Sequence, residues 1–405
     1  MADFPPDFLW GSATSAHQVE GGNTNNDWWR WEHTAGSSAA EPSGDCIDHY
    51  SRYDEDFRLL ASLGQNAHRF SLEWSRIEPA PGEFSRAALD HYRRVLDSLN
   101  THGLVSFATL YHKTLPVWFA DRGGWLAPDA VELFERYVAA VAVALGDRIE
   151  FACTINEPQI ISVFAHATGQ FPPAMRDAEA ATQVNKTLML AHRRAVDVFR
   201  STAPASRVGV CLQLAPFEPA RPDDEDDVAA TQWLRNAMTD AHIDDLTAGG
   251  DVGDFVGLQY YTRARVDSRL PELLAFAAPG VESTQMGWEV HPAGFGEMLR
   301  RIADTGLPIV VTENGIATND DRQRIAYLQT HLAELKRALD DGVDVRGYLH
   351  WSAFDNFEWN HGYHPTFGLI GIDRDDHLRR VVRPSAVAYG QVAATGSLAA
   401  LTVEA

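Results

Sequence analysis

The chain contains a segment, Ile149-Glu150-Phe151-Ala152-Cys153-Thr154-Ile155-Asn156-Glu157-Pro158, in which a short apolar run ends in polar residues and a proline. Residues 149–157 have the length and composition of a buried β-strand, and the proline marks the point where the strand gives way to a loop. A similar pattern recurs at Val311-Thr312-Glu313-Asn314-Gly315. Each segment therefore places a glutamate at the end of a predicted strand.

Strands of this kind alternate with helical patterns along the whole chain. The eight strand candidates are residues 8–14, 66–74, 104–111, 149–157, 208–214, 255–262, 307–313 and 345–354. The clearest helix has the apolar stripe Ile325, Leu328, Leu332, Leu335 and Leu339, whose spacing of three and four is typical of one helix face. Further helices are predicted over residues 86–102, 128–146, 182–200 and 228–249, and loops over 221–227 and 268–283.

Alternation of strand and helix implies parallel strands joined by right-handed crossovers. Eight such units close most naturally into a single (β/α)8 TIM barrel, with the active site at the C-terminal ends of the strands. A doubly wound open sheet is the alternative, but no glycine-rich dinucleotide loop follows the first strand. No internal linker or repeat interrupts the chain, so we expect one domain over residues 1–405.

Composition and charge narrow the class of function. Hydrophobic residues make up 45% of the 405 residues, which is typical of a globular enzyme. The formal charge of −22 argues against nucleic acid and anionic membrane surfaces as partners. Neither a secretory signal nor an apolar run of the roughly 18 residues needed for a membrane span is present, so a cytoplasmic location is expected. Cys46, Cys153 and Cys211 have no metal-type or disulfide-type spacing and predict reduced thiols, two of them buried.

The two glutamates at strand ends indicate a chemistry. Hydrolysis of a glycosidic bond requires one carboxyl group that holds a proton for the leaving oxygen and a second that stays ionised on the opposite side of the sugar. Taken singly, Glu157 or Glu313 is better explained as a surface glutamate. Carried on separate strands of one barrel, both are directed towards the same cleft.

Six motifs occur in order between residues 4 and 392. They are FLWGSATSAHQVEG at 8–21, RFSLEWSRI at 69–77, TLYH at 109–112, NEP at 156–158, TENG at 312–315 and WSAFDNFEW at 351–359. Together they resemble glycoside hydrolase family 1, the β-glucosidase family, and the pattern of residues 26–32 is similar to its bacterial and archaeal branch. The resemblance is much more specific for fold and reaction type than for substrate.

The resemblance implies a retaining β-glycosidase, with Glu157 as general acid/base and Glu313 as nucleophile. Arg69 and Tyr261 would keep Glu313 ionised. Because Trp359 leaves little room for a phosphate, terminal β-D-glucosides are the expected substrates, with β-D-galactosides and β-D-fucosides tolerated. No cofactor and no metal is expected, and the oligomeric state is left open.

The same resemblance implies a set of sugar-binding residues. They are Gln18, His112, Asn156, Trp351, Glu358 and Trp359. An aromatic face stacks on the C–H surface of a sugar, and planar amide and carboxylate groups take paired hydroxyls, so these residue types suit a carbohydrate. Without the family, His112 and the tryptophans would be assigned to the core.

Four positions depart from the family pattern. Lys113 and Thr114 stand where Trp-Asp is usual, Gln259 replaces an asparagine, and Thr366 replaces an arginine. The ammonium of Lys113 is expected either to reach a sugar hydroxyl or Glu358, or to lie along the barrel rim in water. Gln259 lengthens an amide near Tyr261 and would alter the hydrogen bonding around the nucleophile.

Three other functions fit parts of the sequence. A transglycosidase would use the same residues and pass the sugar to an acceptor other than water. A catalytically silent sugar-binding barrel is disfavoured because both glutamates are present. A metallohydrolase would use His350, His361 and His364, but Gly362 and Pro365 argue against a helix that presents two of these ligands together.

Overall fold

A computed structural model describes residues 3–401, and eight parallel strands form a closed barrel at its centre. Around the barrel the strands follow the order β1-β11-β10-β7-β5-β4-β3-β2. Their bounds are β1 (Leu9–Ala13), β2 (Ala67–Ser71), β3 (Val105–Tyr111), β4 (Phe151–Asn156), β5 (Arg207–Gln213), β7 (Phe255–Tyr260), β10 (Ile309–Asn314) and β11 (Val345–Trp351). Each overlaps one predicted strand, and the predicted (β/α)8 barrel is confirmed.

The barrel interior is filled by a small apolar cluster contributed by its strands. The members are Ala67, Phe107, Phe151, Cys153, Cys211, Phe255, Val310 and Leu349. Phe107 and Phe151 stack with ring centroids 4.2 Å apart. All three cysteines are buried and unpaired, as predicted for Cys153 and Cys211. Beyond this cluster, the strands carry polar residues towards their C-terminal ends, where an active site can form.

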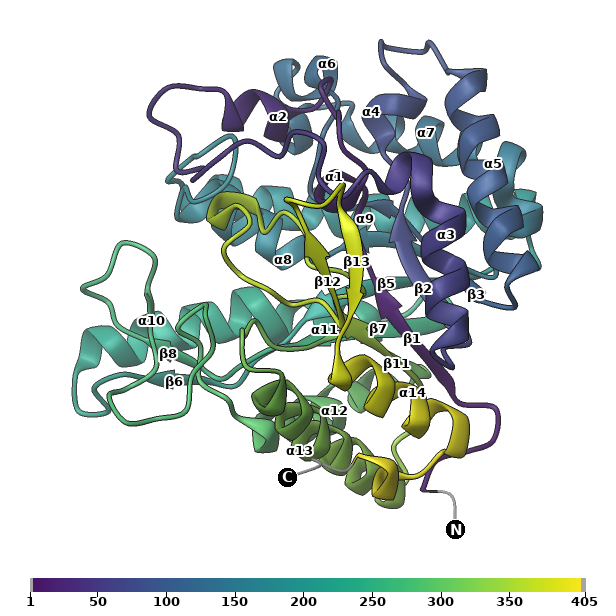
Figure 1. The fold of residues 1–405 in the computed structure, drawn as a ribbon. Coiled ribbons are helices and arrows are strands. Elements are labelled where there is room, and N and C mark those ends of the chain that lie inside the picture. The colour runs from purple at the N-terminus through teal and green to yellow at the C-terminus, as the bar shows by residue number, and fades with distance from the viewer. Residues whose placement is uncertain (1–2, 402–405) are drawn as a thin grey trace.

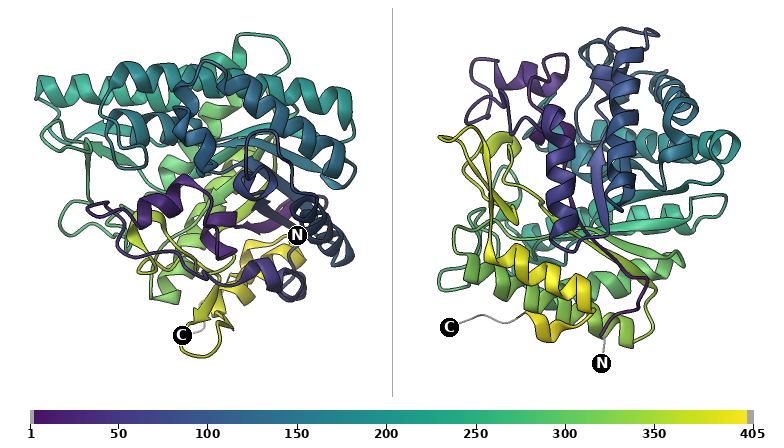
Figure 2. Two further views of the ribbon diagram at one scale, coloured as in Figure 1. Left: turned by 90° about the horizontal axis from the view of Figure 1, so that it is seen from above. Right: turned by 45° about the vertical axis from the view of Figure 1, so that its right-hand side comes forward.

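Helices surround the barrel and bury their apolar faces against it (Figure 1). The longer ones are α3 (His49–Ser62), α5 (Arg86–Thr101), α7 (Ala130–Leu145), α9 (Ala178–Thr202), α10 (Glu225–Arg235), α12 (Pro292–Ile302), α13 (Asp321–Asp340) and α14 (Pro384–Thr395). Short helices are α1 (Ala16–Val19), α2 (Asp27–Glu32), α4 (Trp74–Ile77), α6 (Val117–Asp121), α8 (Pro158–Ile160) and α11 (Ala241–Thr247). The first and last described segments meet, since Asp3 N donates to Gly396 O at 2.6 Å (Figure 2).

The helix predicted over residues 228–249 is confirmed, and it contains a π-helical segment (Asn236–Asp240) between α10 and α11. One loop prediction was wrong in detail. Part of the loop predicted over 221–227 is helical, because the Asp224 side chain accepts a hydrogen bond from Asp227 N and caps α10.

Two small sheets lie outside the barrel. One pairs β12 (Ile370–Asp373) with β13 (Arg379–Val382). The other contains β6 (Phe217–Pro219), β8 (Ala264–Val266) and β9 (Leu274–Ala275), so the loop predicted over 268–283 includes one short strand. With α10 this sheet projects from one side of the barrel (Figure 1). Within residues 3–401, no helix is long and apolar enough to cross a bilayer. That residues 1–405 form one domain remains our proposal, and positions 1–2 and 402–405 lie outside the described residues.

Candidate active site

The predicted site residues gather at the C-terminal ends of the barrel strands. Arg69 lies on β2, Asn156 on β4, Glu313 on β10 and Trp351 on β11. His112, Glu157 and Tyr261 directly follow β3, β4 and β7. Gln18 lies on α1, while Glu358 and Trp359 belong to the segment after β11. Strands far apart in sequence thus bring all ten residues to one end of the barrel.

Hydrogen bonds and an ion pair fix the Glu313 carboxylate. Arg69 Nη1 lies 2.5 Å from Oε1, and Gln259 Nε2 donates to the same oxygen at 2.7 Å. Tyr261 Oη donates to Oε2 at 2.5 Å. Burial raises the pKa of Glu313 to about 7, while the charge of Arg69 and the hydrogen bond from Tyr261 act to lower it.

Asn156 links the hydrogen bonds around Glu313 to His112, one of the predicted sugar-binding residues. Its Oδ1 accepts hydrogen bonds from Arg69 Nη2 at 2.5 Å and from Gln259 Nε2 at 2.8 Å. Its Nδ2 lies 3.2 Å from His112 Nε2. Gln259 therefore uses both amide hydrogens, one on Glu313 and one on Asn156. The asparagine-to-glutamine difference was the one signal in the sequence that pointed to this bridge.

His112 is placed as a neutral hydrogen-bond donor. An amide N–H towards Nε2 makes that nitrogen the acceptor, which leaves the proton on Nδ1. Burial holds the pKa of His112 well below its usual value. Within residues 3–401, the buried Nδ1 has no hydrogen-bond partner.

Three ring systems form an apolar wall beside these polar groups. The His112 ring is nearly parallel to Trp351, with centroids 6.0 Å apart, and to Trp359, with centroids 6.1 Å apart. Gln18 Nε2 donates to Glu358 Oε2 at 3.3 Å and to Phe357 O at 2.9 Å. Flat rings next to paired amide and carboxylate groups provide the two kinds of surface that a sugar presents.

Glu358 is a third carboxyl group in the same site and is half-buried. Burial raises its pKa to about 7, opposed first by the positive charge of Lys113. Glu313 and Glu157 add repulsion in the same direction as burial. Near neutral pH, Glu313 and Glu358 are therefore each partly protonated.

One of the two sequence hypotheses for Lys113, that its ammonium reaches the site, is confirmed. Its side chain is only 11% exposed, and its ammonium Nζ lies 3.0 Å from Glu157 Oε2. The alternative of a lysine on the barrel rim is therefore wrong, and its direct partner is Glu157 instead of Glu358. The other two departures have ordinary local contacts: Thr114 Oγ1 donates to Glu73, and Thr366 Oγ1 donates to Gln285 Oε1.

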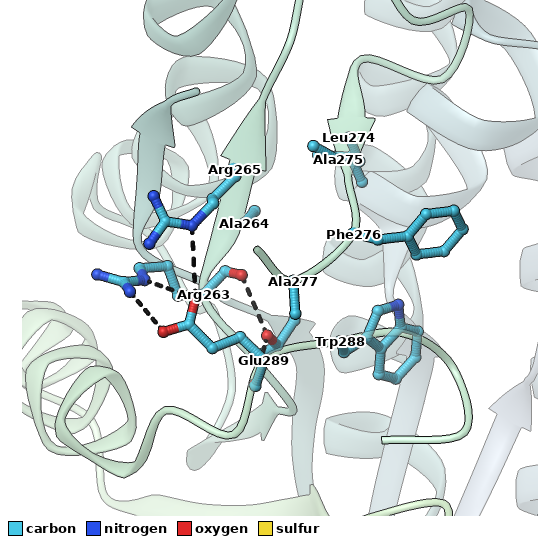
Figure 3. Close-up of a pocket in the computed structure, with 10 residues that line it drawn as sticks. Arg263, Ala264, Arg265, Leu274, Ala275, Phe276, Ala277, Trp288 and Glu289 are labelled. Carbon is cyan, nitrogen blue, oxygen red and sulfur yellow. Dashed lines mark hydrogen bonds and ion pairs between the residues drawn. The ribbon is translucent and has the colours of Figure 1, made fainter. Parts of the chain in front are cut away.

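A small pocket lies beside the site, next to the aromatic neighbour of Tyr261. Trp288, whose ring centroid is 5.7 Å from that of Tyr261, lines this pocket of about 80 Å³ (Figure 3). Its cations are already paired: Arg263 lies 2.5 Å from Glu289 and 3.2 Å from Glu218. Neither Glu157 nor Glu313 lines this pocket.

Histidines give no sign of a metal site. His350 is buried on β11, while His361 and His364 lie in the following segment. Across the described part of the chain, no three histidine, cysteine or acidic side chains are grouped closely enough to hold a metal ion.

Two glutamates lie at the strand ends of this parallel barrel, beside stacked rings and side chains that can hydrogen-bond sugar hydroxyls. This arrangement is that of a barrel glycoside hydrolase. Comparison with known proteins gives the same class. The sequence profile described as glycosyl hydrolase family 1 matches residues 1–275 and 251–397. The chain belongs to this family. The predicted family, and with it the enzyme class of O-glycoside hydrolases, is confirmed.

Individual relatives cover nearly the full chain. β-Glucosidase A of Thermotoga maritima is 32% identical over 98% of this chain and 98% of its own length. A bifunctional β-D-glucosidase/β-D-fucosidase of Bifidobacterium breve is also 32% identical, over 93% of this chain and 95% of its own. Among solved structures, a β-glycosidase from Pyrococcus horikoshii is 34% identical with a TM-score of 0.90, covering 98% of this chain and 96% of that one.

A further solved relative carries a sugar-like inhibitor. The Thermotoga maritima β-glucosidase in complex with glucoimidazole has a TM-score of 0.89 and 31% identity, covering 97% of this chain and 99% of that one.

Proposed function

We propose that the protein is a retaining β-glycosidase that hydrolyses terminal β-D-glucosides through a covalent glycosyl-enzyme. The observation that carries this proposal is the set of three donors on the Glu313 carboxylate, from Arg69, Gln259 and Tyr261. A carboxylate fixed in this way presents a charged oxygen to C1 of a bound sugar.

Glu157 serves as general acid/base in this mechanism. In the first step Glu313 attacks C1 and Glu157 gives a proton to the leaving oxygen. In the second step Glu157 takes a proton from water as the water oxygen bonds to C1 and Glu313 departs. His112, Gln18, Glu358 and Asn156 hold the sugar hydroxyls, and Trp351 and Trp359 cover its apolar face.

The substrate is a neutral β-glucoside, with β-galactosides and β-fucosides tolerated. The name of the Bifidobacterium breve relative, which joins glucosidase and fucosidase, supports this tolerance. The bulk of Trp359, 3% exposed, supports exclusion of a 6-phosphate. A cytoplasmic location stays a prediction from the sequence.

The decisive experiment replaces the nucleophile. Glu313→Ala should lower hydrolysis of 4-nitrophenyl β-D-glucoside by at least about 10³-fold. Added azide should then restore turnover and give a product of inverted anomeric configuration, measured by proton NMR. The control is Glu132→Ala on the exposed face of α7, which should keep full activity. Full activity in Glu313→Ala, or a rescued product of retained configuration, would contradict the assignment.

A further inference from the structure

Trp359, one of the two rings that cover the sugar in the proposed function, has an unfavourable backbone conformation. Its φ of 50° lies in the left-handed region that residues other than glycine rarely occupy, and such a conformation costs on the order of 1–3 kcal/mol. The segment between β11 and β12 that carries it is irregular apart from a short 3-10 turn (Trp359–His361). Neighbouring side chains must therefore fix the position of its ring.

The imidazole ring of His17 packs nearly parallel to this indole. The two ring centroids are 5.7 Å apart, and the ring planes differ by 13°. His17 lies on α1 directly before Gln18, whose side-chain amide donates to Glu358 Oε2. The side chain of His17 has no exposed surface, so a bound sugar does not touch it. Any effect of His17 on the sugar must therefore pass through its neighbours, of which Trp359 is the ring it stacks on.

Hydrogen bonds at both ring nitrogens fix the orientation of His17. Nε2 lies 2.6 Å from Glu32 Oε1, and Nδ1 lies 3.0 Å from Asn26 Nδ2. Asn26 Oδ1 accepts a hydrogen bond from Trp29 N at 2.8 Å, which orients the amide with Nδ2 towards His17. Nδ1 is therefore the acceptor, and Nε2 carries the proton that it donates to Glu32.

The Glu32 carboxylate is held by further donors. Its Oε2 accepts hydrogen bonds from Ser43 N and Ser43 Oγ, both at 2.8 Å, and its side chain has no exposed surface. Burial acts to raise the pKa of Glu32, but the hydrogen bonds from His17 and Ser43 hold that pKa below its ordinary value. An ionised carboxylate is a strong acceptor, so His17 is anchored to a fixed point of the fold.

Trp28 also contacts Trp359, but in a different way. The two ring centroids are 4.5 Å apart, and the planes are inclined at 52°. Apolar contact of this kind is non-directional, so it fills space beside the indole without fixing its angle. The His17 ring cannot turn freely, because both of its nitrogens are hydrogen-bonded. A parallel ring that is itself fixed can define the plane of Trp359.

We propose that His17 and Glu32 are positioning residues that orient Trp359 for stacking on a bound sugar, and that they set the affinity for the glycoside more than the rate of bond cleavage. This inference rests on the proposed function, in which Trp359 covers the apolar face of the sugar. Stacking on that face is made in the bound substrate and is kept in the transition state. A contact made equally in both states lowers KM and leaves kcat unchanged.

The first test variant is His17→Phe, which keeps an aromatic ring and removes both hydrogen bonds. The KM for 4-nitrophenyl β-D-glucoside should rise about tenfold, while kcat should change less than about twofold. Glu32→Ala should give the same result and leaves the imidazole in place, so it tests the proposal even if His17→Phe does not fold. An unchanged KM in Glu32→Ala, or a fall in kcat at constant KM, would overturn the proposal.

The conservative variant Glu32→Gln separates the hydrogen bond from the volume of the side chain. Its amide oxygen can still accept from His17 Nε2, so KM should stay within about threefold of wild type. Equal KM values in Glu32→Gln and Glu32→Ala would refute the role of the hydrogen bond. The matched control is His91→Phe on α5, because His91 is also buried and stacks on a ring, that of Tyr50, at 3.7 Å. This control should leave KM unchanged.

A readout independent of turnover is the ¹H–¹⁵N NMR signal of the Trp359 indole N–H in the free enzyme, identified by its loss in Trp359→Phe. It should shift in Glu32→Ala and keep its place in Glu32→Gln. Both rings are unchanged in these variants, so a shift reports their relative movement. If wild type hydrolyses no glucoside, the proposed function fails, yet this signal still decides whether Glu32 and His17 orient Trp359. Coincident signals in wild type and Glu32→Ala would refute that role.

Discussion

At the scale of single residues, the Glu313 carboxylate is subject to opposing effects. Burial disfavours its charge, while the Arg69 guanidinium and the Tyr261 hydroxyl stabilise it. Their balance leaves the pKa of Glu313 at about 7. Because the nucleophile must be ionised to attack, activity in the proposed mechanism should rise through neutral pH on its acid limb.

This balance predicts the effect of Tyr261→Phe. Removing the hydroxyl takes away a hydrogen bond that lowers the pKa of Glu313, so that pKa rises and the acid limb of kcat/KM should move to higher pH by roughly one unit. The rate at pH 6 should fall about tenfold. A pH profile with 4-nitrophenyl β-D-glucoside measures both effects. Tyr53→Phe, on α3, is the control, and an acid limb that stays in place would show that the hydroxyl does not set the ionisation of Glu313.

The sequence did not predict the contacts of two side chains in the site, those of Lys113 and Gln259. The motifs predicted that Glu157 and Glu313 would lie at C-terminal strand ends of one barrel, and the family resemblance implied Arg69 as the partner of Glu313. The direction of the Lys113 side chain depends on a left-handed backbone conformation at that residue, which no periodic pattern encodes. The paired hydrogen bonds of Gln259 likewise depend on the extra methylene of its side chain and on exact distances across the barrel.

At the scale of elements, both glutamate-bearing strands are irregular near their C-terminal ends. The register of β4 against β5 shifts between Cys153 and Asn156, and that of β10 against β7 shifts between Val311 and Glu313. Such irregularities change the direction in which the following side chains point. The strands themselves were predictable from apolar runs of strand length. The π-helical turn between α10 and α11 was not, since its sequence keeps a helical pattern.

Gly315, which directly follows β10, packs so closely that it leaves no room for a side chain. A Cβ added there would lie 1.7 Å from the carbonyl oxygen of Trp351, which belongs to the backbone and cannot turn aside. Gly315→Ala should therefore lower the free energy of unfolding by about 3 kcal/mol and displace the neighbouring Glu313. Urea unfolding and kcat measure the two effects.

Gly371→Ala on β12 is the matched control for that substitution. Its added Cβ meets first the flexible end of Arg383 at 3.3 Å, so stability should change by less than about 1 kcal/mol. Equal effects of the two alanines would show that the close approach to Trp351 is not what requires glycine.

At the scale of the whole molecule, many titratable groups are buried in their neutral forms. Burial lowers the pKa of His68, His331 and His350 to about 3, and that of His91, His192 and His242 to about 4. Burial raises the pKa of Asp27, Glu313 and Glu358 to about 7. The two sets have opposite consequences for stability.

The sign of each consequence follows from proton binding. Histidines with a lowered pKa stabilise the fold above their unfolded value of about 6.5, and this stability is lost as pH falls towards 4. Carboxyl groups with a raised pKa stabilise it below about 4, and this stability is lost as pH rises through 7. Between pH 5 and 6 the unfolded chain binds protons on six histidines and the folded chain on three carboxyl groups, so stability rises with pH.

We therefore expect the free energy of unfolding to increase from pH 5 to 6 by at least about 1.4 kcal/mol, the slope of one uncompensated proton. His331→Phe removes one buried titrating ring and keeps its stacking against Tyr327, where the ring centroids are 3.6 Å apart. That variant should lower the slope by about 1.4 kcal/mol per pH unit, whereas His33→Phe at an exposed position should leave it unchanged. Urea unfolding at several pH values measures the slope. A slope of zero or below in wild type would mean that the buried carboxyl groups outweigh the histidines, so that acid would stabilise this fold instead of unfolding it.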